Sequence, residues 1–338
     1  MIRPMLLLFP LILGGIVVGA VKNPLANSRT KGLLLVANKA DQTLGIIDPN
    51  AGRQVAAVAE GGTTGHEVIA SPDGKVAYVP IYGNSGVGKP GTDGTNMVAV
   101  DIASRKVVGS LDFGRGVRPH CPVFGPKDGL LYVTTELDNA VTAIDPHNLK
   151  IIATIPTGHP ESHMLAITHD GRYGYTANVG SGTISVLDLE ARKLIDTIAV
   201  APVVQRIALS VDDRLAFTSD QTKPQLAIID TRSRKIRNWV PLPAPGYGTA
   251  PTPDGKWLVI ALPSAKKVAV LNLKTLKVEH AIDVPAAPQE VLVRPDGAVA
   301  YVSCDASHQV AEIQTSNWTV SRLIDAGQGA DGLAWARQ

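Results

Sequence analysis

The sequence has few aromatic residues, few charged residues and no marked excess of charge of either sign. Aromatic residues make up 4% of the 338 residues, charged residues 18%, and the formal net charge is +2. A nearly neutral chain offers no broad basic surface for nucleic acid or for an anionic membrane. So few aromatic rings also argue against an extended platform on which the bases of a single strand could stack.

Cysteine is scarce as well, and several catalytic motifs are missing. Cys121 and Cys304 are the only two cysteines. Two cysteines cannot form a disulfide framework, so one bridge and two free buried thiols both remain open. The chain contains no Gly-x-Ser-x-Gly motif, no Walker-type phosphate loop and no Cys-x-x-Cys-His motif. These absences argue against covalent serine chemistry, P-loop nucleotide hydrolysis and covalently attached heme.

Apolar runs that approach the length of a membrane span are lacking except at the N-terminus. The first twenty residues, MIRPMLLLFPLILGGIVVGA, carry Arg3 ahead of an apolar stretch that ends in the small residues VGA. This pattern is typical of a secretory signal peptide over residues 1–20, followed by a linker over 21–31. An uncleaved anchor is the alternative. We therefore expect a periplasmic or secreted protein with no membrane span in the mature chain.

What the sequence does contain is a repeat. The stretch AVTAIDPHNLKIIATIPT at 140–157 has six relatives along the chain, and the last three intervals are 42 residues each. Between the copies lie turns such as SPDG and TPDG, each followed by a short apolar strand such as AYV. Four short strands per unit, seven times over, predict an all-β, seven-bladed β-propeller with four antiparallel strands per blade. We expect it to occupy residues 32–338 as a single domain.

The ends of the repeat region complement each other, and one unit is longer than the rest. The chain opens at GLLLVAN (32–38), which matches a second strand, and closes at ADGLAWA (330–336), which matches a first strand. The C-terminal strand is therefore predicted to complete the N-terminal blade and close the ring. The longer unit carries the Gly-rich insertion YGNSGVGKPGTDGT (82–95) between its second and third strands. An insertion of this kind is a candidate lid.

Alignment of the seven first strands brings one position into register around the ring. First strands line the centre of a propeller, so this position is expected at one mouth of the central channel. The loops between second and third strands, the insertion among them, fall on the same face. The position is occupied, in chain order, by His66, His120, His163, Gln205, Tyr247, Gln289 and Asp331.

Three consecutive histidines in this ring make the mouth a candidate functional site. His66, His120 and His163 are candidate ligands of a divalent transition metal, because three imidazoles with one open position suit a catalytic zinc-like ion. Two residues that directly follow the ring position are further candidates. Glu67 is a candidate base, and Arg206, which follows Gln205, is a candidate partner for a substrate carboxylate.

Each candidate also has a purely structural interpretation. A channel mouth is wet, so polar side chains are expected there without any function. Arg206 can form an ion pair with Glu290 across the channel, and Arg118 can pair with Glu136 from a neighbouring loop.

Two family resemblances follow from particular motifs. The pattern PDGK..AYV with N..S..V.V.D resembles the YVTN-repeat propeller family over nearly the whole mature chain, which implies the fold and a scaffold with varied ligands. GHEVIASPDGKVAYVP and VRPHCPVFGPKDGLLYVTTEL are similar to motifs of the lactonase propeller family, which includes 6-phosphogluconolactonase-like enzymes. That resemblance implies site roles for His66, Arg118, His120 and Glu136. The order here is Arg-Pro-His, where that family has Pro-Arg-His.

Two functions remain open from the sequence. The first is an exported hydrolase or lyase of a small lactone-like or anionic substrate, in which the three histidines hold a metal or act directly as acid–base groups. The second is a non-catalytic periplasmic propeller that carries a metal, a cofactor or a partner protein. In either case we expect a monomer that binds a small molecule or a periplasmic protein, and no nucleic acid.

Overall fold

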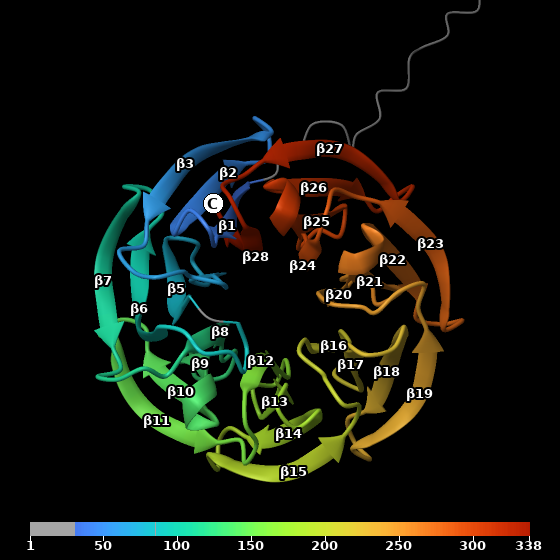
Figure 1. Cartoon of the computed structure of the whole chain (residues 1–338), viewed down its shortest axis with the longest axis horizontal. Coiled ribbons are helices and arrows are strands. Elements are labelled where there is room, and N and C mark those ends of the chain that lie inside the picture. Colours follow the sequence, from blue (N-terminus) through green and yellow to red (C-terminus); the bar gives the residue numbers. More distant parts are fainter. Residues whose placement is uncertain (1–30, 85) are drawn as a thin grey trace, which may run out of the picture. The chain divides into compact units, whose positions relative to one another are not determined.

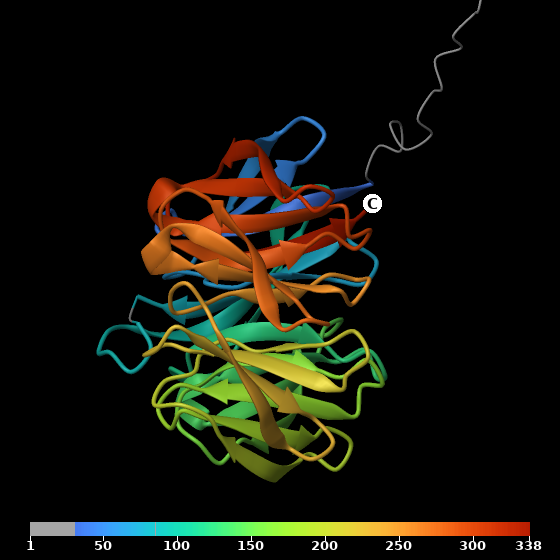
Figure 2. The same ribbon diagram turned by 90° about the vertical axis from the view of Figure 1, so that its right-hand side faces the viewer.

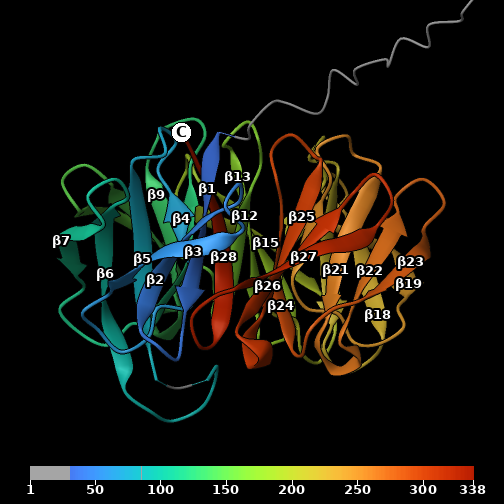
Figure 3. The ribbon, with the colours of Figure 1, turned by 90° about the horizontal axis from the view of Figure 1, so that it is seen from above.

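The computed structural model describes residues 31–84 and 86–338, which form a ring of seven four-stranded antiparallel sheets (Figure 1). The prediction of an all-β propeller with seven blades of four strands is therefore confirmed. Within these described residues, helix is confined to three short 3-10 turns, η1 (Glu136–Asp138), η2 (Pro263–Ala265) and η3 (Asp305–Ser307). In the side views of Figures 2 and 3 the strands run across the thickness of the ring.

The blades follow one another in chain order, and each begins with its innermost strand. Blade 1 is the exception, because its innermost strand is the last one of the chain. Blade 1 consists of β28 (Ala330–Arg337), β1 (Gly32–Asn38), β2 (Thr43–Asp48) and β3 (Arg53–Ala59); blade 2 of β4 (Ile69–Ala70), β5 (Val76–Gly83), β6 (Asp93–Asp101) and β7 (Lys106–Asp112); blade 3 of β8 (Pro119–Phe124), β9 (Leu131–Thr135), β10 (Ala140–Asp145) and β11 (Lys150–Pro156); blade 4 of β12 (Ser162–Ile167), β13 (Tyr173–Asn178), β14 (Thr183–Asp188) and β15 (Lys193–Ala199). Blade 5 consists of β16 (Ala208–Leu209), β17 (Leu215–Asp220), β18 (Gln225–Asp230) and β19 (Lys235–Pro241); blade 6 of β20 (Thr249–Pro251), β21 (Trp257–Leu262), β22 (Lys267–Asn272) and β23 (Lys277–Asp283); blade 7 of β24 (Pro288–Val293), β25 (Val299–Cys304), β26 (Gln309–Gln314) and β27 (Thr319–Asp325).

The ring is closed by the pairing of the two ends of the repeat region. Strand β28 runs antiparallel to β1, so that Leu34 faces Trp335 on one side and Ile47 of β2 on the other. The predicted closure by the C-terminal strand is confirmed. Because the first blade is built from both ends, the ring cannot open without separating β28 from β1.

The repeated Asp or Asn of the first six blades caps the turn between the third and fourth strands, and blade 7 has Gln314 at this position. In blade 5, for example, the Asp230 carboxylate accepts a hydrogen bond from the Ser233 backbone N–H at 2.7 Å. Asx turns of this kind fix a tight connection through the side chain itself. This explains why the residue recurs at the repeat interval. The same arrangement is found at Asp48, Asp101, Asp145, Asp188 and Asn272.

Apolar side chains fill the spaces between neighbouring blades. Leu165, Tyr175 and Val186 of blade 4 are buried in one cluster with Val141 of blade 3 and Ala227 of blade 5. Burying a large apolar side chain stabilises the fold by about 1.5–3 kcal/mol. Stacking of blades is therefore what holds the innermost strands, and the residues at their ends, in fixed positions.

The ring has two distinct faces. The innermost strands β8, β12, β24 and β28 begin on one face, which we call the ring mouth, and their following turns lie on the opposite face. The connection between β5 and β6, which contains the insertion, lies on the mouth side and projects beyond the neighbouring loops (Figure 3).

The described chain forms one compact unit from Lys31 to Gln338. The signal peptide predicted over 1–20 and the linker predicted over 21–31 lie outside the described residues, apart from Lys31. In the part of the chain that the structure describes, no helix is both long and apolar enough to cross a membrane. Export therefore stays a prediction.

Candidate functional site

The three predicted histidines meet at the ring mouth. The His120 ring lies between the other two, stacked on His163 with ring centroids 3.7 Å apart and edge-on to His66 at 5.7 Å. His120 and His163 each follow the first residue of an innermost strand, β8 and β12. His66 lies just ahead of β4. The register derived from the repeat thus brought together side chains that are far apart in the sequence.

A tyrosine and a glutamate tie the histidines to the second strands of their blades. Tyr82, at the end of β5, lies 4.6 Å from the His66 ring and 5.2 Å from the His120 ring. Its hydroxyl donates a hydrogen bond to Glu136 Oε2 at 2.8 Å. The same carboxylate oxygen lies 3.2 Å from His163 Nδ1. Glu136 therefore lies beside the histidines and orients the imidazole of His163, while its role in a reaction stays a prediction.

The ring nitrogens of the histidines differ in their surroundings. His163 Nε2 lies 3.1 Å from the Gln205 side-chain nitrogen, so both of its ring nitrogens face hydrogen-bonding groups. His120 Nδ1 is buried and has no hydrogen-bond partner among the described residues. Burial lowers the pKa of both imidazoles below the ordinary histidine value, and their mutual proximity adds to this for His120. Both are therefore neutral at physiological pH.

The arrangement is not that of a metal centre. Within residues 31–84 and 86–338, no three His, Cys, Asp or Glu side chains are grouped to hold a metal ion. His120 and His163 stack face to face instead of pointing their nitrogens at one point, and Glu136 and Gln205 engage the nitrogens of His163. The expected three-histidine ligand set is therefore not formed in this geometry, although the three rings are neighbours.

His66 is the histidine that faces open space. It lines a hollow of about 380 Å³ at the mouth, together with Lys39, Asp305 and Asn84 of the insertion. No hydrogen bond to its ring occurs in the described part of the chain. Burial lowers the pKa of His66 to about 3, against the raising effect of the Asp331 carboxylate. At neutral pH this imidazole is unprotonated, with both its lone pair and its N–H available to a ligand.

Deeper in the centre, charged groups gather around one arginine. Arg206 Nη1 lies 2.6 Å from Glu67 Oε1 and 2.5 Å from Glu290 Oε2, and its guanidinium stacks over the Tyr247 ring at 4.7 Å. Asp331 approaches the same guanidinium at 3.7 Å. Burial raises the pKa of Glu67, while Arg206 opposes that shift. Glu67 and Arg206 were predicted as site residues, and the structure places them in this buried ion-pair cluster.

Arg118 is placed differently from the other candidates. Its backbone has a positive φ of 48°, and its side chain is buried and turned toward the insertion. There it pairs with Asp93 at 2.7 Å and donates hydrogen bonds to the carbonyl oxygens of Gly86 and Lys89. Its nearest approach to Glu136 is 3.8 Å. Arg118 thus fastens the insertion to blade 3, which makes it an anchor of the mouth loop.

Sequence reasoning missed three residues of the mouth and left one question open. Tyr82 was overlooked because it is part of the insertion, although an aromatic residue at the mouth end of a second strand was a usable signal. Lys39 bonds Asp305 at 2.8 Å and Asp331 at 3.0 Å. Glu60 is buried beside the segment that leads to His66, and it was missed because it is not part of any recognisable sequence motif. The two cysteines are both buried and free.

Comparison with known proteins gives one family and several relatives. The family model described as the cytochrome D1 heme domain matches residues 125–329, whereas the sequence motifs had suggested the YVTN-repeat family. A 6-phosphogluconolactonase of Bacillus subtilis (strain 168) is 32% identical over 91 residues, which cover 24% of this chain and 26% of that relative. The chain thus matches about a quarter of the length of this curated relative.

Among solved structures, the similarity extends over the whole propeller. Hydrazine synthase of Kuenenia stuttgartiensis has a TM-score of 0.74 at 19% identity, covering 90% of this chain and 99% of that one. The periplasmic gluconolactonase of Pseudomonas aeruginosa has a TM-score of 0.71 at 15% identity, covering 91% and 99%. At such low identity these structures show a shared fold.

Proposed function

The chain belongs to the cytochrome D1 heme domain family, and from that premise we propose a function for its ring mouth. We propose that the mouth binds a small lactone-like, anionic molecule and hydrolyses its ester bond, with His66 as the proton-accepting group. The observation that carries the proposal is the unpartnered, neutral imidazole of His66, which faces a hollow of about 380 Å³. Two of the relatives are named as lactonases, which supports the choice of substrate class.

The family name implies a heme, so the mouth must be compared with what a heme requires. Protein ligands of heme iron are typically His, Cys, Met or Tyr side chains. His163 is the one ring-position histidine in the matched range 125–329, and Glu136 and Gln205 already engage its nitrogens. The hollow at His66 has no large aliphatic side chain in its lining, whereas sites for large flat ligands are lined mostly by large apolar and aromatic side chains. The mouth does not fit a heme, and the reaction proposed here does not use one.

We propose direct acid–base chemistry by His66 in place of the metal-assisted mechanism, because of how the histidine side chains are arranged. With no three-ligand set among the described side chains, the imidazole itself has to move the proton. An attacking water would add its oxygen to the lactone carbonyl carbon and give its proton to His66. When the ring C–O bond breaks, His66 would return that proton to the leaving alkoxide oxygen, and the product is an open hydroxy acid.

Charges around the hollow support this cycle. The negative charge of the Asp331 carboxylate acts on His66 and favours the imidazolium that forms during attack. The pKa of about 3 already includes this effect, so without Asp331 the imidazole of His66 would be a still weaker base. Lys39 lies beside the hollow, where it bonds Asp305 and Asp331, and it would bind an anionic group of the substrate only by giving up one of these contacts.

The decisive experiment measures hydrolysis of a panel of lactones, including gluconolactone and 6-phosphogluconolactone, by wild type and by His66→Ala. We expect kcat/KM to fall by about 10²–10⁴-fold in His66→Ala. It should be unchanged in His147→Ala, an exposed turn histidine that serves as the matched control. A chelator should leave the rate of wild type unaltered. Because the pKa of His66 is about 3, this imidazole stays unprotonated down to about pH 4. Titration of His66 should therefore not lower kcat/KM between neutral pH and about pH 4.

Other results would exclude this function. Equal rates in wild type and His66→Ala would show that His66 is not the base, and no turnover of any lactone would favour the non-catalytic binding propeller. Loss of activity on chelation would restore the metal-assisted variant. A heme titration provides a further contrast, because a Soret shift present in wild type and lost in His66→Ala would show that the mouth takes a heme after all.

A further inference from the structure

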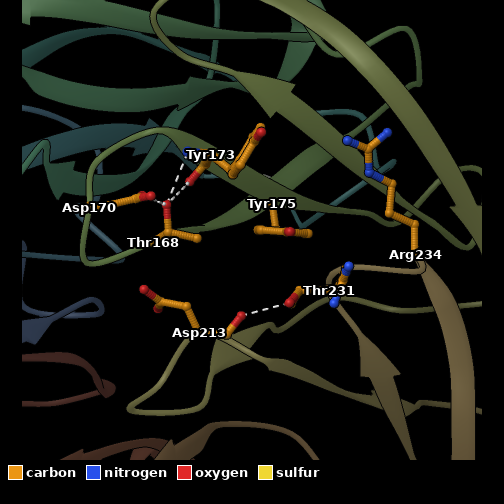
Figure 4. A pocket seen from close by; sticks show the side chains of 8 residues that line it. Thr168, Asp170, Tyr173, Tyr175, Asp213, Thr231 and Arg234 are labelled. Atoms are coloured by element: carbon orange, nitrogen blue, oxygen red, sulfur yellow. Dashed lines mark hydrogen bonds between the residues drawn. The ribbon is translucent and has the colours of Figure 1, made fainter.

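A second pocket lies between blades 4 and 5, on the face opposite the ring mouth. It has a volume of about 330 Å³ and is formed by turns that follow innermost strands or connect third to fourth strands. This volume falls in the range of small-molecule sites. Figure 4 shows Tyr175 between Thr168 and Thr231, with Asp170 on one side and Arg234 on the other. It is lined by Thr168, Asp170, Tyr173, Tyr175, Asp213, Thr231, Arg232 and Arg234.

One lining residue departs from the repeat. In the other turns of this type the last residue is glycine with positive φ, as at Gly171 (69°) and Gly255 (68°). Blade 5 has Asp213 there instead, with φ 58°, a conformation that non-glycine residues adopt at a cost. Its carboxylate bonds the backbone N–H of His169 at 2.8 Å and lies 2.7 Å from His169 Nδ1. The Asp213 side chain thus connects blade 5 to blade 4 and places a carboxylate at the pocket.

A second feature of the pocket is the tyrosine at its centre. Among the equivalent tyrosines of other blades, the Tyr78 hydroxyl donates to the Pro146 carbonyl oxygen at 3.1 Å and the Tyr132 hydroxyl to Asp128 at 2.7 Å, whereas the Tyr301 hydroxyl has no partner among the described residues. The Tyr175 side chain is equally buried, with 2% exposure, yet no described residue accepts a hydrogen bond from its hydroxyl. Tyr175 lines the pocket, so this hydroxyl is available to a bound molecule.

The charges of the pocket balance. Two carboxylates, Asp170 and Asp213, face two guanidiniums, Arg232 and Arg234. Among the described residues the Arg234 side chain has one hydrogen-bond partner, Asp196 at 3.4 Å, so most of its donors face no described acceptor and can bind a ligand. Such a lining gives no reason to select a strongly charged ligand, but it offers donors, acceptors and aromatic carbon in a small volume.

We propose that this pocket binds a neutral polyhydroxylated molecule of the saccharide class. Ring hydroxyls would accept hydrogen bonds from Arg234 and donate them to Asp170 and Asp213. The Tyr175 hydroxyl would form a further bond, and the carbon face of the sugar would pack on the tyrosine rings. The site is separate from the ring mouth and does not depend on the hydrolysis proposed there.

Binding of glucose, cellobiose and myo-inositol to the full chain, measured by saturation-transfer NMR and calorimetry, tests this assignment. We expect at least one of them to bind, and Tyr175→Phe to weaken that binding by about fivefold, the loss of one hydrogen bond. Arg234→Ala should weaken it by about tenfold, because its hydrogen bonds are charge-assisted. Tyr132→Phe, the equivalent tyrosine of blade 3, is the matched control and should bind as wild type does.

The variants also separate this pocket from the mouth. His66→Ala should bind the sugar with unchanged Kd, and Tyr175→Phe should retain whatever lactone hydrolysis wild type shows. Arg234 is on the surface, so Arg234→Ala tests the site even if Tyr175→Phe is poorly folded. Three results would overturn the proposal: no binding of any of the three probes, equal binding by wild type and Arg234→Ala, or loss of binding in His66→Ala.

Discussion

Two clusters of polar side chains at the ring mouth differ in charge: one is neutral and the other is ionised. On one side lies the imidazole half, His66, His120 and His163, which burial keeps neutral. On the other lies the charged half, in which Arg206 pairs with Glu67 and Glu290 at hydrogen-bonding distance. The histidines occupy the ring position itself, whereas Glu67, Arg206 and Glu290 each lie one residue further along the chain.

The difference separates structural polarity from available chemistry. In the charged half each ionised group has a counter-charge, so its groups hold the blades together and have little capacity left for a ligand. In the imidazole half, His66 has no hydrogen-bond partner among the described residues and lines the hollow. Neutral groups that border open space can change partners during a reaction at a far smaller desolvation penalty than a buried ion pair. Changes in the charged half should therefore affect stability most, and changes in the imidazole half activity.

The largest effect is expected from Arg206→Leu. Removing the guanidinium leaves Glu67 and Glu290 buried without a cation, and breaking a buried ion pair in this way costs about 3–5 kcal/mol. Urea unfolding, followed by far-ultraviolet circular dichroism, should show a loss of that size in the free energy of unfolding.

Neutralising the partners provides the control for that variant. Adding Glu67→Gln and Glu290→Gln to Arg206→Leu removes the uncompensated charges, so the triple variant should be more stable than Arg206→Leu at neutral pH. If Arg206→Leu alone costs less than about 1 kcal/mol, the charged half is not the structural element described here.

Nearly all of the fold could be predicted from the sequence, because the repeat gives both the strands and their order. The position shared by His66 and Asp331 was located by aligning the seven first strands of the repeat, and both residues lie at the mouth. The insertion was also visible, since one interval was longer than the rest. Periodicity determines where a residue lies on a propeller, and that is why the register was correct.

The chemistry of the site was less predictable, because it depends on side-chain orientation. The sequence places His120 and His163 in adjacent blades but cannot show that their rings stack at 3.7 Å. It also cannot show that Arg118 turns toward the insertion, which follows from a positive φ at that residue. Tyr82, although central to the site, has no aromatic counterpart at the mouth end of the other second strands, and this departure from the repeat was the one available signal for it.

A smaller and pH-dependent effect is expected from Glu60→Gln, next to the imidazole half. Glu60 Oε1 is buried without a hydrogen-bond partner among the described residues, and Oε2 accepts from the Gly65 N–H. Burial raises the pKa of Glu60 to about 7, above its unfolded value of 4.5. The folded state therefore holds the proton more tightly, and this contribution to stability is present below about pH 4.5 and is lost as pH rises through about 7.

Comparing the two proteins across that range isolates the contribution. The difference in free energy of unfolding, Glu60→Gln minus wild type, should rise by at most about 3 kcal/mol between pH 4.5 and pH 7. Glu279→Gln, the same substitution at an exposed position, should show no such gain. A constant difference between Glu60→Gln and wild type over this range would contradict the assignment.

The smallest effect on stability is expected from His120→Phe, within the imidazole half itself. The phenyl ring can keep the stack on His163 and the edge contact with His66, and it removes a nitrogen, Nδ1, that is buried without a partner. We therefore expect the free energy of unfolding to change by less than about 1 kcal/mol, since replacing an unpaired polar group by an apolar one of similar shape is nearly neutral. His163→Phe is the matched contrast, because it strips Glu136 and Gln205 of a partner and should cost about 1–3 kcal/mol. If both variants unfold at the same urea concentration, the imidazole half is held by hydrogen bonds at His120 as well, and the contrast between a fixed charged half and an adaptable imidazole half fails.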